Sequence, residues 1–200
     1  MLQRFRTEEI YDAATDDEAF DQLALSLAGA IGARSGVIHW KDFGRDTEEV
    51  SYSGYFSADQ MALYERHFAD ADLWSAAVRA PERVNRVWDC EQLVSPEEYE
   101  NGLLYNEWVR AMGDDSFRAV GSSVRTETAV GEIGFHRGKD QPAFGPDVVR
   151  IVEEGLSHIR RMVSIRSRLI AERRASSDLA GSLDVVGVAG LTLRSCRKLV

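Results

Sequence analysis

The stretch FRAVGSSVRTETAVGEIGFHRG (117–138) decides the fold, because it reads as two β-strands that pair with each other. The segments 117–127 and 129–138 each alternate from one residue to the next, as half-buried strands do. Only a short turn separates them, and a connection that short joins antiparallel strands. The sequence therefore predicts an antiparallel β-hairpin at this place.

The two faces of the first strand differ in side-chain size. Val120 and Val124 share one face, whereas Ala119, Gly121 and Ser123 share the other. A face of small residues leaves space for something bulky. We expect an aromatic side chain from a packed helix to fill it, and a ligand is the alternative.

A long helix follows the hairpin and begins at Gly145-Pro146-Asp147, where proline fits the first helical turn. We expect it to span residues 146–178 and to carry signals between domains. Its apolar residues recur at heptad spacing, which predicts a homodimer through this helix. The dimerisation residues are then Val152, Leu156, Ile159 and Val163. The alternative is that the first half of the helix packs on the sheet of its own chain.

The residues before the hairpin supply further helices and a second hairpin. Ser95 with Pro96 predicts the start of a helix that ends near Gly113, and Ser57 with Gln60 forms a capping box for another. The remaining segments are a predicted strand pair at 36–41 and 48–54 and two predicted helices within 5–32. Short hairpins and packed helices predict an α+β fold, a GAF/PAS-like antiparallel sheet flanked by helices, over residues 1–145.

Composition limits the class of protein. The chain has 200 residues, 44% of them hydrophobic, which is enough for one buried core. No apolar run is long enough for a membrane span, and the first residues lack the apolar segment of a secretory signal. Two cysteines cannot make a disulfide scaffold. We therefore expect a cytoplasmic protein with no membrane contact.

Charge is distributed unevenly along the chain, whose formal net charge is −9. Residues 1–149 carry an excess of acids, which argues against nucleic-acid binding by the body. Residues 150–200 carry an excess of bases. A solvated helix face explains that excess better than direct DNA binding through a basic tail, which stays open as an alternative.

Catalytic and metal-binding patterns are missing from the sequence. The histidines His39, His67, His136 and His158 show no paired-ligand spacing, and no nucleophile elbow or phosphate-binding loop occurs. We therefore predict neither an enzyme nor a metal or cofactor site.

Three stretches together resemble a known family: ALYERHFADADLWSAAV (62–78), SPEEYENGLLYNEWVRAMG (95–113) and AFGPDVVRIVEEGLSHIRRMVSIRSRL (143–169). With residues 11–33, they are similar to the N-terminal sensory region of bacterial LuxR-type transcriptional regulators. Asn106-Glu107-Trp108 matches a family motif, whereas Asp72-Leu73-Trp74 lacks the usual central proline. The family's C-terminal helix-turn-helix is missing here. The resemblance implies that residues 179–200 are a truncated tail, in which 183–194 is the opening strand of a further PAS-like segment.

Aromatic residues and one carboxylate form the candidate ligand site. Tyrosine and tryptophan give flat apolar walls with a polar end, and a pocket needs that mixture and a few convergent polar groups. Asp72 could accept a hydrogen bond from a ligand amide or amine, or it could simply cap the following helix. The aromatics could likewise be ordinary core. The predicted ligand-binding residues are Trp40, Tyr52, Tyr64, Asp72, Trp74, Trp88 and Trp108.

The resemblance and these residues lead to one functional hypothesis and one alternative. The hypothesis is a sensory domain of a LuxR-type regulator that binds a small organic signal and passes it through a dimerising helix. The alternative is a ligand-free homodimerisation module that titrates a full-length regulator. The alternative predicts a closed core without a cavity.

Overall fold

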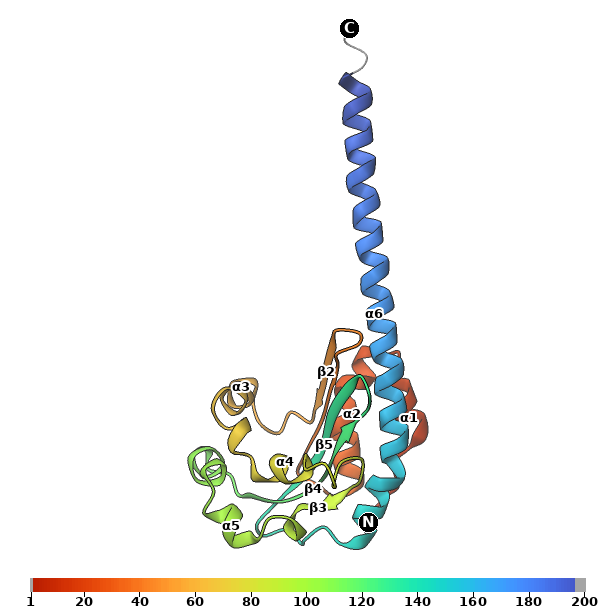
Figure 1. Cartoon of the computed structure of the whole chain (residues 1–200). Coiled ribbons are helices and arrows are strands. Elements are labelled where there is room, and N and C mark those ends of the chain that lie inside the picture. The colour runs from red at the N-terminus through yellow and green to blue at the C-terminus, as the bar shows by residue number, and fades with distance from the viewer. Residues whose placement is uncertain (1, 197–200) are drawn as a thin grey trace.

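The computed structural model describes residues 2–196, with side chains to residue 179, and contains a five-stranded antiparallel sheet with helices on both faces (Figure 1). The strand order is β2-β1-β5-β4-β3. The strands are β1 (Ser35–Asp42), β2 (Thr47–Tyr52), β3 (Trp88–Asp89), β4 (Ser116–Arg125) and β5 (Ala129–Gly138). The helices are α1 (Thr7–Asp12), α2 (Asp17–Ala30), α3 (Ala58–His67), α4 (Leu73–Val78), α5 (Pro96–Glu100) and α6 (Pro146–Cys196), with short helical turns η1 (Ala69–Ala71), η2 (Cys90–Gln92), η3 (Tyr105–Val109) and η4 (Arg110–Met112). The predicted α+β class is confirmed.

Both predicted hairpins form, and the second strand of one pairs with the first strand of the other. The hairpin at 117–138 is β4 and β5, joined by antiparallel pairing from Arg125 opposite Val130 outward. β1 pairs with both β2 and β5, so it connects the two hairpins into one sheet. The two-residue strand β3 extends the sheet beyond β4 and was not predicted.

The predicted helix starts hold, whereas one predicted helix is broken. The Ser57 side chain accepts from the Gln60 backbone N–H, and the Gln60 side-chain oxygen accepts from the Ser57 backbone N–H. The two hydrogen bonds form a complete capping box for α3. Ser95 caps α5 in the same manner, by accepting from the Glu98 backbone N–H. The helix expected to continue to Gly113 stops at Glu100 and resumes as the wide π-turn η3, which changes the direction of its side chains.

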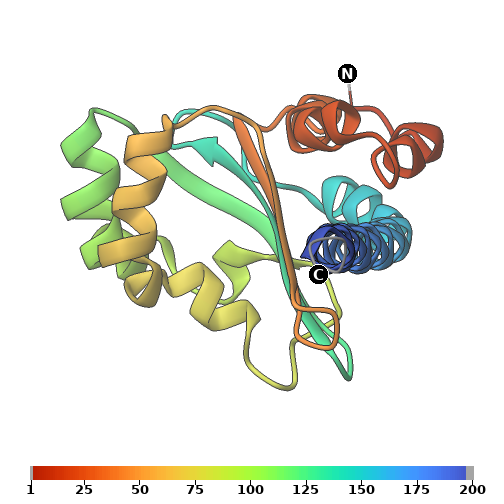
Figure 2. The same ribbon diagram turned by 90° about the horizontal axis from the view of Figure 1, so that it is seen from above.

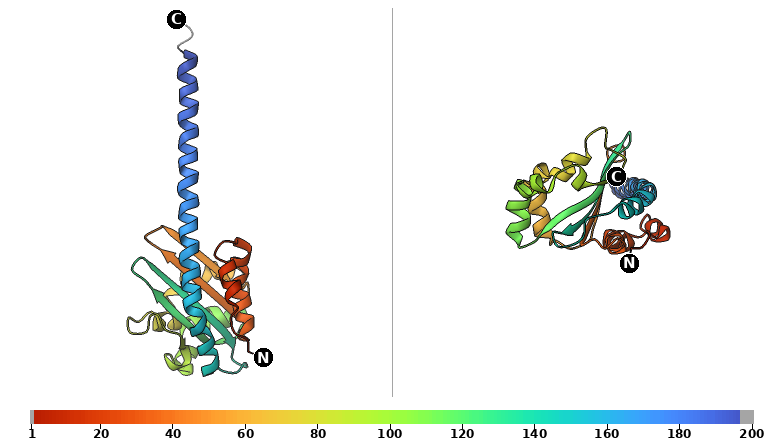
Figure 3. Two further views of the ribbon diagram at one scale, coloured as in Figure 1. Left: turned by 90° about the vertical axis from the view of Figure 1, so that its right-hand side faces the viewer. Right: turned by 90° about the horizontal axis from the view of Figure 1, so that it is seen from below.

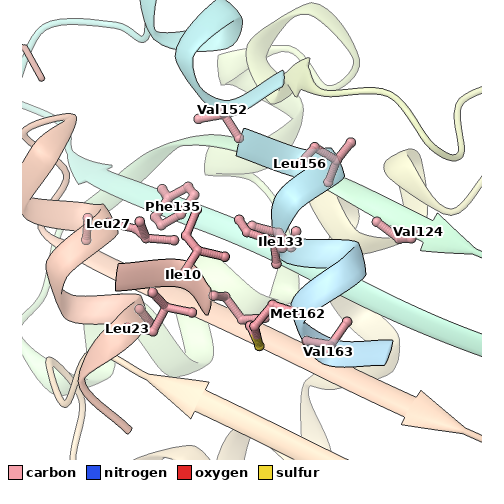
Figure 4. Packing of buried hydrophobic residues seen from close by; sticks show 14 of the residues in the cluster. Ile10, Leu23, Leu27, Val124, Ile133, Phe135, Val152, Leu156, Met162 and Val163 are labelled. Atoms are coloured by element: carbon pink, nitrogen blue, oxygen red, sulfur yellow. The ribbon is translucent and has the colours of Figure 1, made fainter. Parts of the chain in front are cut away.

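One face of the sheet is closed by α1, α2 and α6, which lie together on the same side (Figure 2). Apolar side chains from these helices meet those of β1, β4 and β5 in a continuous core (Figure 4). Phe135 of β5 is fully buried there. The core includes Ile10, Leu23, Leu27, Val124, Ile133, Phe135, Val152, Leu156, Met162 and Val163.

This packing corrects the predicted dimerisation residues. Val152, Leu156, Ile159 and Val163 are at most 4% exposed, and all four belong to the core of their own chain. A helix that packs on a sheet needs the same apolar stripe as a helix in a coiled coil, so the heptad pattern cannot separate the two cases. The alternative interpretation, in which the first half of the helix packs on its own sheet, describes the structure.

The long helix also extends further than predicted. α6 runs from Pro146 to Cys196 and projects beyond the sheet (Figure 3). The expected strand at 183–194 therefore lies within a helix, and residues 197–200 lie outside the described residues. None of the described helices is both long and apolar enough to cross a lipid bilayer.

Arg166 connects α6 to β2 and α2 at the edge of the closed face. It is only 7% exposed, and it lies over the Phe20 ring at 4.2 Å. Its Nε donates to Glu49 of β2 at 2.6 Å, and a second nitrogen donates to Asp17 at 2.7 Å. This buried cation explains why an arginine interrupts the apolar stripe of the helix.

Candidate functional site

The other face of the sheet is hollow. A cavity of about 400 Å³ lies between this face and the segment from α3 to η3. That volume lies within the range of small-molecule sites in proteins. Its floor is formed by strand residues and its walls by short helices, which pass across the sheet at a distance (Figure 2).

The floor follows from strand alternation. Cross-strand partners point to the same face, so the pairing of Gly121 with Gly134 places two residues without side chains next to each other. A Cβ at Gly121 would lie 2.5 Å from the Ile133 carbonyl oxygen, so no larger residue fits there. Val37 of β1 and Ala119 of β4 border the gap. The floor is hollow because its residues are small.

Aromatic rings form the walls in two groups. Trp74 of α4 stacks on Tyr99 of α5, with ring centroids 3.9 Å apart and nearly parallel planes. Trp108 of η3 contacts Phe56 and Tyr64, with centroids at 4.7 and 5.3 Å. These rings give the cavity flat apolar surfaces that favour an apolar or aromatic ligand group.

Asp72 is the centre of the polar part of the cavity. Its Oδ1 accepts from the backbone N–H groups of Trp74 and Ser75, at 2.9 and 3.2 Å, which caps α4. Its Oδ2 accepts from the Tyr64 hydroxyl at 2.8 Å and from the Ser75 hydroxyl at 3.0 Å. The capping interpretation of Asp72 is therefore confirmed, and the same carboxylate lines the cavity.

Ser75 connects Asp72 to a second carboxylate. Its Oγ lies 3.2 Å from Glu132 of β5, whose other oxygen pairs with Arg79. A hydroxyl has one proton, so Ser75 fully satisfies Asp72 or Glu132 but not both. One carboxylate oxygen is thereby left able to accept from a ligand.

Burial sets the protonation of the polar groups around the cavity. It raises the pKa of the Tyr52 phenol to about 12, and it raises the pKa of Tyr64 further, with the adjacent Asp72 charge adding to the effect. Burial also raises the pKa of the Cys90 thiol, so Cys90 stays protonated and unreactive at neutral pH. The phenols therefore remain hydrogen-bond donors at neutral pH.

Two solved structures share this architecture. The ligand-binding domain of VqsR from Pseudomonas aeruginosa has a TM-score of 0.57 at 13% identity, over 80% of this chain and 92% of that one. The N-acylhomoserine-lactone-dependent LuxR-family transcription factor CepR2 from Burkholderia cenocepacia has a TM-score of 0.53 at 15% identity, over 82% and 95%. This chain shares the fold of these two proteins. No protein-family model and no curated protein sequence matches it.

Five of the seven predicted ligand-binding residues line the cavity. They come from β2, α3, α4 and η3 and from the turn before α4, which the fold brings around one cavity. They are Tyr52, Tyr64, Asp72, Trp74 and Trp108.

The other two predicted residues, Trp40 and Trp88, do not line the cavity. Trp40 of β1 points to the closed face, where it is buried in the core among apolar residues. Trp88 of β3 does not line the cavity, and its indole N–H donates to the Arg83 carbonyl at 3.0 Å. The error at Trp40 arises because the direction of a strand side chain depends on register, which aromatic content does not reveal. Trp88 pairs with Gly121 of the floor but lies in the edge strand, beyond the cavity.

Several lining residues were not predicted, and β5 carried a signal for three of them. Glu132, Gly134 and His136 alternate with Gly131, Ile133 and Phe135, so one face of β5 is polar or small and the other is mostly apolar. Among the described residues, no group of three or more histidine, cysteine or acidic side chains is arranged to hold a metal ion.

Proposed function

We propose that this chain is a cytoplasmic sensory domain of a LuxR-type regulator that binds a small organic signal in the cavity. The cavity itself is the observation that carries the proposal. It combines aromatic walls with a buried polar cluster, as pockets for small molecules do. A ligand-free dimerisation module would have filled this space with side chains, so the cavity favours ligand binding over that alternative.

The polar cluster sets the orientation of the bound signal. One oxygen of Asp72 or Glu132 is free to accept an N–H or O–H from the ligand, because Ser75 supplies a single proton. The apolar part of the ligand then lies against Trp74 and Trp108. This arrangement suits a molecule with one polar end and one apolar end.

The sheet connects the cavity to α6. Glu48 of β2 lines the cavity, whereas the next residue, Glu49, bonds to Arg166 of α6. A signal that shifts β2 would therefore act directly on the helix. In this proposal α6 forms a homodimer through the part beyond Ser167, since the preceding apolar stripe is already buried.

Native mass spectrometry of the purified protein, followed by denaturation, tests binding and oligomeric state together. We expect a dimer that carries a non-covalent small molecule, and we expect the molecule to be released on denaturation. Trp108→Phe should reduce its retention. Trp40→Phe is the matched control, because both tryptophans are 5% exposed and only Trp108 lines the cavity.

Two results would contradict the proposal. Equal loss of the small molecule in the Trp40 and Trp108 variants would place the binding site elsewhere. A protein that carries no small molecule, and whose melting temperature no neutral organic probe raises, would contradict binding altogether.

A further inference from the structure

His136 lines the cavity, and the proposed function gives no role to its ring nitrogens. It lies in β5 opposite Ser35 of β1 and Ala119 of β4, at one end of the glycine floor. Its ring is stacked near Trp74, with centroids 5.8 Å apart and planes 23° from parallel. The imidazole is therefore fixed between a strand and an aromatic wall.

The two nitrogens of this imidazole have different surroundings. Nδ1 lies 3.0 Å from the Ser35 hydroxyl oxygen. The opposite edge of the ring faces the place that Gly134 leaves open, since Cε1 and Nε2 each lie 3.6 Å from the position a Cβ would take there. Nε2 has no hydrogen-bond partner within the part of the chain that the structure describes, and both residues line the cavity.

Hydrogen-bond satisfaction determines which nitrogen carries the proton. Ser35 is 1% exposed, and His136 Nδ1 is the acceptor within reach of its hydroxyl among the described residues. A buried hydroxyl proton needs an acceptor. Nδ1 therefore accepts from Ser35, and the neutral ring carries its proton on Nε2. Burial supports the neutral form, because it lowers the pKa of His136, although Asp72 and Asp114 oppose this effect.

Charge around the cavity restricts the ligand that this donor can meet. The carboxylates of Glu48, Asp72 and Glu132 line the same cavity, and the cation Arg79 is already paired with Glu132. An anionic ligand would be repelled by these carboxylates. A neutral molecule with an acceptor oxygen meets no such repulsion.

We infer that the Nε2–H of His136 is a specificity-determining donor that binds a carbonyl oxygen of a neutral ketone, ester or amide ligand seated over Gly134. This inference rests on the proposed function, because it assigns a ligand class to the same cavity. It adds a donor on the floor to the acceptors at Asp72 and Glu132.

The tautomer can be tested without any ligand. Long-range ¹H–¹⁵N correlation spectra of the histidine rings report which nitrogen is protonated, and His136→Gln identifies the signals of His136. We expect a neutral ring protonated on Nε2 at neutral pH. A ring protonated on Nδ1 would overturn the inference.

Two probes of matched shape test recognition of the carbonyl group. Hexanophenone has a carbonyl group where hexylbenzene has a methylene group, and the two molecules are otherwise identical. Tryptophan fluorescence measures the binding of each probe. We expect the protein to prefer the ketone by about 2- to 12-fold, the value of one neutral hydrogen bond. His136→Phe should abolish this preference and keep hexylbenzene binding. His136→Gln, which retains an N–H donor, should restore part of the preference.

His39→Phe is the matched control. His39 also lines the cavity, but its Nε2 is bonded to Glu48 at 2.9 Å, so its replacement should leave the preference unchanged. Circular dichroism verifies that each variant is folded.

The outcomes separate this inference from the proposed function. Equal binding of both probes, unchanged in His136→Phe, would overturn the role of His136 while the cavity remains a binding site. Failure of both probes to bind the wild-type protein would overturn both, because the cavity would then not accept neutral organic molecules of this size.

Discussion

The two faces of the same sheet are built in opposite ways. On the closed face, α1, α2 and α6 contribute apolar side chains to one continuous core (Figure 4). On the hollow face, the covering helices are short, and α3 has no fully buried residue. Those helices are held by aromatic contacts and by polar bonds such as Tyr64 to Asp72. The comparison shows how one sheet can support a closed apolar core on one face and a cavity on the other.

The largest expected effect concerns the closed face. Phe135→Ala should lower the free energy of unfolding by about 3–5 kcal/mol, because it removes a fully buried ring from the core of the closed face. Urea denaturation measures this loss. A loss below about 1 kcal/mol would mean that the closed face is not the main source of stability.

Two glycines of β5 allow a matched comparison of the faces. Gly131→Val should cost about 1–3 kcal/mol, because a Cβ there would lie 2.4 Å from the Trp40 ring on the closed face. Gly134→Val should change stability by less than about 0.5 kcal/mol, because its Cβ would meet only ordinary contacts at 3.5 Å and beyond.

The Gly134 variant should still affect binding, because its side chain occupies the cavity floor. We expect weaker binding of hexanophenone in a fluorescence titration. Equal destabilisation by the two valines would remove the distinction between the faces.

The pH dependence of stability gives a smaller effect. Burial holds the pKa of His136 below its ordinary 6.5, so below that pH the unfolded chain takes up a proton that the folded chain does not. This contribution to stability is complete above pH 6.5 and is lost as the pH falls, at no more than about 1.4 kcal/mol per pH unit. His136→Gln should have a flatter profile in urea denaturation between about pH 7.5 and 5.5. Parallel profiles would contradict the buried neutral imidazole.

The smallest effect concerns the cover of the hollow face. Ser57→Ala removes the capping box of α3 and should cost about 1 kcal/mol or less. Because α3 has no fully buried residue, we expect the loss as faster amide hydrogen exchange within Ala58–His67, with little change elsewhere. Uniformly faster exchange across the sheet would show that α3 unfolds only with the whole domain.

The sequence predicts the local features of this fold well. Both hairpins and the starts of α3 and α5 follow from residues that are close together in the chain, such as Ser57 with Gln60. The predicted extent of α6 was wrong. Val185, Val186 and Val188 favour a strand by local preference, but they lie within the helix. A strand of two residues, such as β3, leaves too short a pattern to be detected.

The candidate site depends on non-local information, and this is where sequence reasoning succeeded only in part. Asp72 and Tyr64 come from one continuous segment, and their proximity follows from it. Trp40 was misplaced because nothing in its strand says which face the long helices cover. The alternation of β5 places His136 on the polar face of its strand, but its proposed role depends on Ser35 and Gly134 in neighbouring positions of the sheet, which the sequence alone does not reveal.

The attachment of α6 at Arg166 has a mechanical consequence. The helix is held by Glu49 and Asp17 at this residue and by the Asp46 carbonyl oxygen at Arg174, and roughly 22 further residues extend about 33 Å beyond Arg174 at about 1.5 Å per residue. A change in the tilt of α6 at these attachments therefore moves its far end more than its base, and a tilt of about 5° displaces the far end by about 3 Å.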